Sequence, residues 1–160
     1  MAGSERAGYG AARVDLFERA TVIVTPTDAT PPEAVKVVTG LWEGIGARVR
    51  QLDPATHDRV VAAISHLPHL VAFALVAGAH RFEASSFAFA AGGFRDTTRV
   101  AAADPVMWQE IFHGNREAVL ASLGRFRGAL AELERLVEGD DVAGLREWIA
   151  GAKALREAMA

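Results

Sequence analysis

Two short polar runs in this Ala-rich chain contain the residues that could do chemistry. The first is Ser65-His66-Leu67-Pro68-His69, and the second extends from Gly92 to Arg99 and includes Arg95 and Asp96. Each places charged or titratable groups inside a stretch whose apolar pattern predicts buried helix. Buried polar groups need partners from protein, water or a ligand. Both runs are therefore candidate ligand sites.

His66 and His69 are three residues apart, so on a helix they share one face. That spacing fits two metal ligands, but a zinc site needs three or four and no Asp or Glu stands at a complementary offset. Two other interpretations stay open. The imidazoles bond to helix carbonyls freed by a kink at Pro68, or they line a pocket where neutral rings offer a donor and an acceptor to a hydroxylated anion.

The Gly-Gly break before the second run lets the backbone approach a ligand closely, and it lets guanidinium groups project from a helix start. A guanidinium donates two parallel hydrogen bonds to a carboxylate. We predict this role for Arg99, which lies between two threonines and an apolar stretch. Arg95 is interpreted as part of a surface cluster of little energetic weight. Trp108 is interpreted as a core residue. It is also close enough in sequence to Arg99 to form one wall of a pocket.

The elements that position these runs follow from residue periodicity. Residues 21–25 are β-branched throughout and predict a buried strand. Thr30 and Glu33 match a capping box with proline at the first helical position. Alternation over residues 47–52 predicts an edge strand. Together these segments form a strand-helix-strand unit, which is typical of the end of an α/β domain.

The remainder of the chain is predicted to be helical. Four helices are expected, over residues 54–80 with a kink at Pro68, 83–91, 105 to about 138, and 142–158. The first of them is too apolar for a helix with a single buried stripe. Its cover must come from the later helices or from a second copy of the chain, and we favour a homodimer.

Composition narrows the class of protein. A chain of 160 residues forms one or two compact units, and the absence of cysteine suits a reducing cytoplasm. The net charge is −3 with no basic patch among aromatics, so nucleic acid is not an expected partner. Polar residues interrupt every long apolar run and the start lacks a signal pattern, which predicts a soluble protein with no membrane span.

The order of the motifs resembles the prephenate dehydrogenase family. The segments that carry the resemblance are Ser65–His69, Gly92–Arg99, Asp104-Pro105-Val106-Met107-Trp108 with Asn115-Arg116, and, upstream, Met1-Ala2-Gly3-Ser4-Glu5, Ala12–Phe17 and Thr25-Pro26-Thr27. The resemblance covers nearly the whole chain. It implies a mostly α fold, in which a helical substrate-binding and dimerisation domain at 53–160 follows a strand-helix-strand remnant of a Rossmann-like α/β domain at 1–52.

The resemblance also implies an activity. Family members use NAD or NADP to oxidise prephenate at its ring hydroxyl carbon, with loss of carbon dioxide, and they form 4-hydroxyphenylpyruvate for tyrosine synthesis. This chemistry needs a base near the hydroxyl, a cofactor that accepts hydride, and cations for two carboxylates. Arg99 would bind a substrate carboxylate. Six other residues would line or shape the pocket: His66, His69, Gly92, Asp96, Trp108, and Glu5 near the cleft.

Two family features are missing. Family members carry a His-Pro pair directly before the Met-Ala-Gly-Ser-Glu run, and that histidine is catalytic, whereas this chain starts at Met1. The strand and G-x-G-x-x-G turn that cradle the cofactor's pyrophosphate are also missing. The chain thus resembles an amino-terminally truncated dehydrogenase with little or no turnover alone, and no catalytic or cofactor-binding residue is assigned. Two alternatives are a regulatory helical dimer that binds prephenate, tyrosine or a related aromatic acid, and a purely structural association domain.

Overall fold

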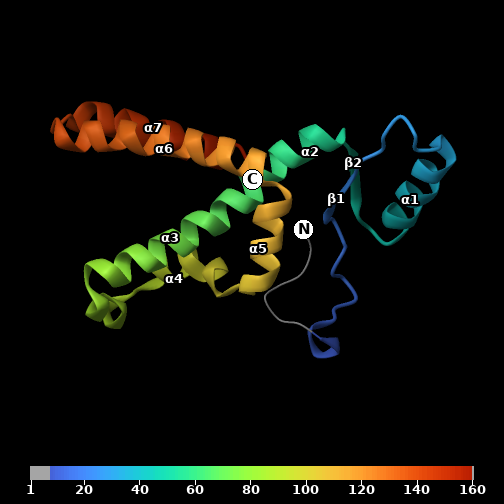
Figure 1. Ribbon diagram of the computed structural model, residues 1–160, viewed down its shortest axis with the longest axis horizontal. Helices are drawn as coiled ribbons and strands as arrows, with labels where there is room; N and C mark the ends of the chain where they lie inside the picture. The colour runs from blue at the N-terminus through green and yellow to red at the C-terminus, as the bar shows by residue number, and fades with distance from the viewer. Residues whose placement is uncertain (1–7, 160) are drawn as a thin grey trace. The chain divides into compact units, whose positions relative to one another are not determined.

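The computed structural model describes residues 8–159. The chain divides into two compact units, residues 1–119 and residues 120–160, and each is described by itself. Helices dominate both units, and the two strands β1 and β2 lie near the N-terminus (Figure 1). The predicted mostly α fold with a small strand-helix-strand unit is therefore confirmed.

The strand-helix-strand unit consists of β1 (Thr21–Val24), α1 (Pro32–Gly44) and β2 (Arg48–Gln51), preceded by a short 3₁₀ turn. The strands pair in parallel over their whole length. Helix α1 crosses between them and packs on both, with Trp42 in edge-to-face contact with Phe17 at a centroid distance of 5.2 Å. Parallel strands need such a crossover connection.

The capping box predicted at the start of α1 is wrong. Pro31 occupies the N-cap position and makes no side-chain capping bond. The hydroxyl of Thr30 instead accepts the backbone N–H of Thr27 at 2.9 Å. The two residues also form a turn, in which the N–H of Thr30 donates to the carbonyl of Thr27, so the hydroxyl is used in this local turn and not in a helix cap. Pro32 at the first helical position confirms the other part of the prediction, and it has no N–H that needs an acceptor.

A long helical stretch follows, built from α2 (Pro54–Val61), a π-helical turn η2 (Ala62–His66) and α3 (Leu67–Phe82). The sequence predicted one helix kinked at Pro68, and the structure corrects this to two helices joined by a wider turn. Pro68 has no N–H, and its ring crowds the carbonyl of the residue four positions earlier, Ile64. The π turn that ends just before it widens the backbone at that point.

The same stretch, Pro54–Phe82, is long and apolar enough to cross a membrane by length and composition. The sequence predicted no membrane span because polar residues interrupt this run, and that stays a prediction. No Asp, Glu, Lys or Arg stands between Arg59 and Arg81, and the polar interruptions are serine and histidine side chains. Only 17% of the most apolar 18-residue window is buried within the structure. This helix therefore presents an apolar surface that needs cover from another molecule or another part of a larger protein.

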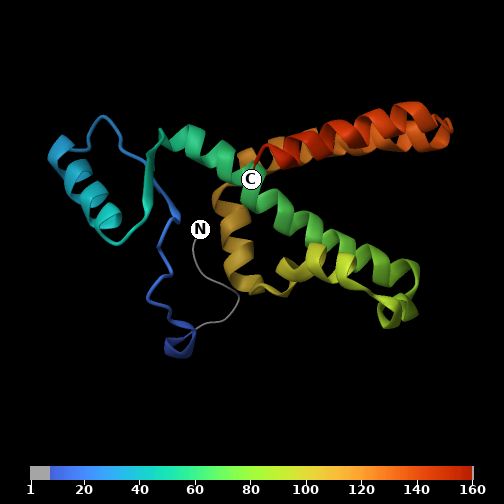
Figure 2. The same cartoon turned by 180° about the vertical axis from the view of Figure 1, so that it is seen from behind.

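Shorter elements pack along α3. They are the 3₁₀ helix η3 (Ala84–Phe89), the helix α4 (Gly92–Thr98) and the 3₁₀ turn η4 (Arg99–Ala102). Both views show α4 beside α3 (Figures 1 and 2). The predicted helix over 83–91 is thus a 3₁₀ segment. The pair Gly92-Gly93, which was expected to break that helix, instead begins α4.

Helix α5 (Pro105–Gly114) starts at Asp104, whose carboxylate accepts the N–H of Met107 at 2.8 Å. The predicted continuous helix to residue 138 is wrong, because the chain breaks at Asn115 and resumes as α6 (Arg116–Glu138). Glycine and asparagine in succession have low helix propensity. The Asn115 side chain also bonds outside its own helix, which favours the break.

In the second unit, α6 runs beside α7 (Val142–Glu157) as a helical hairpin (Figures 1 and 2). Asp141 caps the start of α7, since its carboxylate accepts the N–H of Gly144 at 2.9 Å. The core of the described chain is small. Its buried apolar residues are Ala47, Ala62, Ala72, Trp108 and Val119, accompanied by the buried polar residues Ser65 and Thr98.

Candidate functional site

The first polar run lies where the π turn meets α3. The ring nitrogen Nδ1 of His69 is 2.9 Å from the carbonyl oxygen of Ser65, one turn earlier. A carbonyl oxygen only accepts, so Nδ1 carries the hydrogen and donates it. One interpretation of the sequence expected the histidines to bond to helix carbonyls near Pro68. For His69 this expectation is confirmed. The second nitrogen of the ring, Nε2, is not used by this bond.

Trp108 from α5 forms the floor of the site. Its ring stacks on His69 with centroids 3.6 Å apart and planes at 22°, and it meets His66 edge-on at 6.2 Å. Phe112, one turn later, contacts Trp108 at a centroid distance of 5.3 Å. Trp108 is only 5% exposed, so the prediction that it belongs to the core is confirmed. It also lies against both histidines, as a pocket wall would.

The indole N–H of Trp108 is buried and has no hydrogen-bond partner among the residues that the structure describes. A buried donor without an acceptor costs about 1–3 kcal/mol, so native proteins rarely leave one unused. An acceptor from a ligand or from another chain would remove this cost.

His66 contacts Asn115 at the break between α5 and α6. The amide nitrogen of Asn115 lies 3.3 Å from Nδ1 of His66 and 2.9 Å from the backbone carbonyl of Asp58 in α2. These bonds join segments about fifty residues apart in the sequence. Asn115 entered the sequence interpretation only as part of a motif. The sequence nevertheless distinguishes Asn115, because it is the one asparagine of the chain and it interrupts an apolar helical pattern.

Burial lowers the pKa of His66 below its ordinary value of 6.5, and the nearby charges of His57 and His69 lower it further, while Asp58 raises it. Desolvation disfavours the charged imidazolium. His66 is therefore neutral at pH 7, as a ring that exchanges hydrogen bonds with a ligand requires.

This lowered pKa gives a pH dependence of stability. Above pH 6.5 the ring is neutral in the folded and unfolded chains alike. As the pH falls below 6.5, the unfolded chain takes up the proton first, so the free energy of unfolding falls until the pH passes the folded-state pKa. We expect urea denaturation between about pH 7 and about pH 5.5 to show a smaller loss of stability in His66→Gln than in the unchanged chain. Equal losses would contradict this assignment.

The second polar run forms α4 and η4, which pack on α3. Arg99 is exposed at the junction of α4 and η4, next to the buried Thr98, whose hydroxyl donates to the carbonyl of Phe94 at 2.6 Å. Arg95 donates from Nε to the carbonyl of Ala90 at 3.1 Å. Arg95 therefore bonds to the local backbone, and Arg99 stands at the turn that contacts α3.

Gly92 and Asp96 lie four residues apart in α4, one helical turn from each other. A Cβ placed on Gly92 would lie 3.9 Å from the Asp96 carboxylate oxygen Oδ2, which is an ordinary van der Waals contact. Of the other predicted site residues, the structure brings His66, His69 and Trp108 into direct contact. Glu5 lies outside the described residues.

Neither a metal nor a dinucleotide finds a built site in the described part of the chain. Over residues 8–159 no group of three or more His, Cys, Asp or Glu side chains is placed to hold a metal ion. The connection from β1 to α1, residues 25–31, contains two prolines and no glycine. A pyrophosphate cradle needs backbone N–H groups and a close approach of the chain, so these residues do not fit that group.

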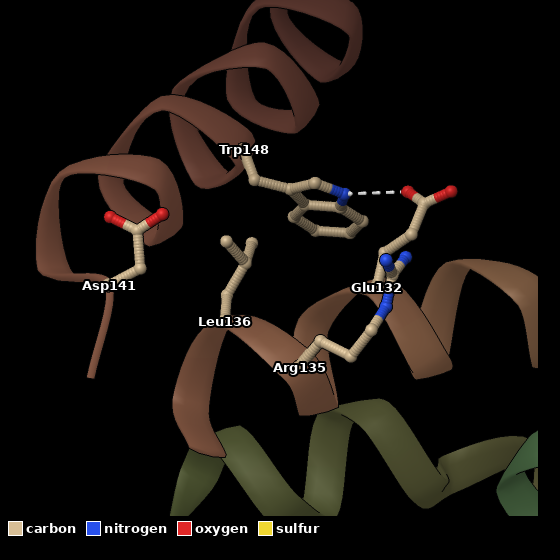
Figure 3. Close-up of a pocket in the computed structure, with 5 residues that line it drawn as sticks. All are labelled: Glu132, Arg135, Leu136, Asp141 and Trp148. Atoms are coloured by element: carbon tan, nitrogen blue, oxygen red, sulfur yellow. Dashed lines mark hydrogen bonds between the residues drawn. The ribbon is translucent and has the colours of Figure 1, made fainter. Parts of the chain in front are cut away.

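Two cavities lie apart from the histidines. One, of about 310 Å³, lies between α6 and α7 and is lined by Trp148 and Leu136 with charged side chains around them (Figure 3). There the indole Nε1 of Trp148 donates to Glu132 at 3.4 Å. The other cavity, of about 460 Å³, lies where α3, η3 and α4 meet and is lined mainly by four phenylalanines: Phe82, Phe87, Phe89 and Phe94. His66, His69 and Trp108 are not among the lining residues of either cavity.

Comparison with known proteins shows which protein family the chain matches. Residues 53–151 match the family described as "Prephenate dehydrogenase, dimerization domain", and residues 1–51 match "Prephenate dehydrogenase, nucleotide-binding domain". Among solved structures, prephenate dehydrogenase from Aquifex aeolicus in complex with hydroxyphenyl propionate and NAD+ is similar, with a TM-score of 0.92 and 35% identity over 99% of this chain and 56% of that one.

Two curated proteins are similar at the sequence level. The prephenate dehydrogenase of Bacillus subtilis is 36% identical over 99% of this chain and 44% of its own length. The cyclohexadienyl dehydrogenase of Zymomonas mobilis is 37% identical over 88% of this chain and 50% of its own length. The chain spans about half the length of these relatives. Because one family profile matches most of its residues, the chain belongs to the prephenate dehydrogenase family of oxidoreductases.

Proposed function

We propose that this chain supplies the substrate-binding and dimerising half of a prephenate dehydrogenase. The proposed reaction oxidises prephenate to 4-hydroxyphenylpyruvate with release of carbon dioxide, and NAD or NADP supplies the hydride acceptor when bound. The matched ranges support a division into a dinucleotide-domain remnant at 1–52 and a helical domain at 53–160. The complex of the Aquifex relative with an aromatic acid supports the substrate class.

One observation carries the proposal. Two histidines and a tryptophan from three segments meet at a single place, and the buried indole N–H of Trp108 has no acceptor among the described residues. A ligand that carries hydroxyl or carboxylate oxygens supplies the missing acceptor. The rings also offer an apolar face to a cyclohexadiene ring, as pockets for small ligands commonly do.

The remaining roles follow from charge and position. Arg99 binds a substrate carboxylate through its guanidinium fork. His66 and His69 bond to substrate oxygens, and Gly92 and Asp96 shape the turn that presents Arg99. Glu5 belongs to the same proposal from the sequence alone. None of these residues is assigned as the base that removes the hydroxyl proton, and no residue is assigned to the cofactor.

We infer that the chain is a cytoplasmic homodimer. Three apolar side chains on the long helix remain exposed: Ile64 at 67%, Leu75 at 41% and Phe82 at 94%. They are eleven and seven residues apart, which places them along one helical face. An exposed apolar stripe marks an interaction surface, and the match to a dimerisation domain supports a second copy as its cover.

The function is tested with the purified chain, prephenate, and either NAD or NADP at high concentration. Formation of reduced nicotinamide is followed by its near-ultraviolet absorbance, and binding of prephenate and hydroxyphenyl propionate is measured by calorimetry. Turnover would establish the dehydrogenase. Binding without turnover would favour the non-catalytic dimer that binds aromatic acids. No binding of either acid would contradict both proposals and leave the structural association domain.

Trp108→Phe tests the unpartnered donor directly. The variant keeps an aromatic ring on His69 but removes the indole N–H, so we expect hydroxyphenyl propionate to bind about tenfold more weakly, the worth of one good hydrogen bond. Trp148→Phe in the α6–α7 hairpin is the matched control and should leave binding unchanged. Unfolding in urea, measured in parallel, separates loss of affinity from loss of packing. Unchanged affinity in Trp108→Phe would remove this residue from the site.

A further inference from the structure

The orientation of the Asn115 amide is fixed by its surroundings. Its nitrogen Nδ2 lies 2.9 Å from the backbone carbonyl oxygen of Asp58. That oxygen can only accept a hydrogen bond, so the amide nitrogen, and not the amide oxygen, must face it. The two hydrogens of the amide nitrogen point in different directions, which leaves one of them for a second acceptor.

The second acceptor is Nδ1 of His66, at 3.3 Å from the same amide nitrogen. An amide nitrogen donates and does not accept, so Nδ1 of His66 must accept. A neutral imidazole carries one hydrogen, which is then on Nε2. The Asp58 carboxylate instead contacts Nδ1 of His57, at 3.0 Å.

His69 has the opposite arrangement. Its Nδ1 faces the carbonyl oxygen of Ser65 at 2.9 Å and must donate. In the neutral ring, Nε2 of His69 is then an acceptor. The two histidines that contact Trp108 are therefore held in different tautomers, one by a side-chain donor and the other by a backbone acceptor.

We propose that Asn115 is a positioning residue that fixes His66 as an Nε2–H donor, so that His66 and His69 together offer one donor and one acceptor. A hydroxyl group needs this combination, because its oxygen accepts one hydrogen bond while its hydrogen is donated into another. The use of the pair on a hydroxylated acid rests on the proposed function. The tautomers themselves do not, because the contacts within the chain define them.

Titratable, aromatic and amide side chains from several elements surround His66. They are His57 and Asp58 on α2, His69 on α3, Trp108 on α5, and Asn115 at the break before α6. Only the Asn115 amide is within hydrogen-bonding distance of His66 Nδ1 among the described contacts. Asn115 is therefore the side chain to change.

Nitrogen NMR of the full chain with ¹⁵N-labelled histidine measures the tautomers without substrate or cofactor. At a pH where the rings are neutral, we expect a pyridine-like Nδ1 and a pyrrole-like Nε2 for His66, and the reverse for His69. The spectra of His66→Gln and His69→Gln assign the signals. A pyrrole-like Nδ1 for His66 in the unchanged chain would overturn the proposal.

Two variants test the role of Asn115. In Asn115→Leu the donor is lost at similar side-chain size, so His66 should show signals averaged between its tautomers. In Asn115→Asp a carboxylate accepts, so the hydrogen should move to Nδ1. The His69 pattern should persist in both variants, which shows that the fold is intact. An unchanged His66 pattern in both variants would overturn the role of Asn115.

The same samples separate this proposal from the proposed function. If the tautomer pattern is present but hydroxyphenyl propionate does not bind, the proposed function fails and the assignment of Asn115 stands. If the acid binds equally well to the unchanged chain and to Asn115→Leu while the tautomer changes, the donor role of His66 toward that ligand is excluded. Weaker binding in Asn115→Leu, restored in part by Asn115→Gln, supports the complete proposal.

Discussion

Replacing Arg99 by alanine should weaken the binding of hydroxyphenyl propionate about a hundredfold, which corresponds to about 2.7 kcal/mol. The acid carries a carboxylate, and a guanidinium provides two charge-assisted hydrogen bonds to such a group. Arg99 is exposed at the junction of α4 and η4, so its removal should cost little folding free energy. Calorimetric titration of the two chains measures the change in affinity.

Arg95→Ala is the matched control. Arg95 belongs to the same short helix, but its Nε donates to the carbonyl of Ala90, so we expect its removal to change affinity by less than about twofold, as for a surface charge. Arg99→Lys should fall between the two alanine variants, because lysine keeps the charge and loses the planar fork. Equal weakening by both alanine variants would point to general charge attraction and against a specific carboxylate contact.

Leu75→Asp should convert the proposed homodimer to monomer. In a two-fold symmetric dimer the substitution occurs twice in one interface. Each copy removes an apolar side chain whose burial is worth about 1.5–3 kcal/mol and adds a charge that must lose its water. We expect the dissociation constant to rise by at least about a thousandfold, as measured by sedimentation at several concentrations.

Val37→Asp in α1 is the control for this experiment. Val37 is 70% exposed but lies outside the residues that match the dimerisation domain. It adds the same charge to another apolar helix face, and the oligomeric state should not change. A Leu75→Asp chain that remains dimeric, with Val37→Asp also dimeric, would show that a different surface carries the association.

Short-range sequence patterns were enough to predict those strands, helix starts and side-chain pairs that depend on residues close together in the chain. The strand-helix-strand unit was predicted correctly, since β-branched runs and a proline-started helix leave few other arrangements. The N-caps at Asp104 and Asp141 follow from a carboxylate that accepts a backbone N–H three residues later. The closeness of His66 and His69 is likewise a property of helical spacing.

Features that depend on distant contacts escaped prediction. The helix break at Asn115 is stabilised by bonds to Asp58 and His66, far away in the sequence. The stacking of Trp108 on His69 joins α5 to α3, and periodicity alone cannot choose such a partner. The π turn was replaced by a simple kink in the prediction, because proline indicates where a helix is disturbed and not how the backbone adapts.

The π turn between α2 and α3 also sets the rotational phase of everything that follows it. One residue corresponds to about 100° of rotation about a helix axis, so the wide turn decides which side of α3 faces Trp108. If Ala62–His66 were wound as ordinary α-helix instead, the extra residue would turn His69 away from the indole. The apolar stripe beyond it would turn by the same angle. A single backbone irregularity thus sets how both the candidate ligand site and the proposed association surface are oriented relative to α2, and its loss would turn both at once.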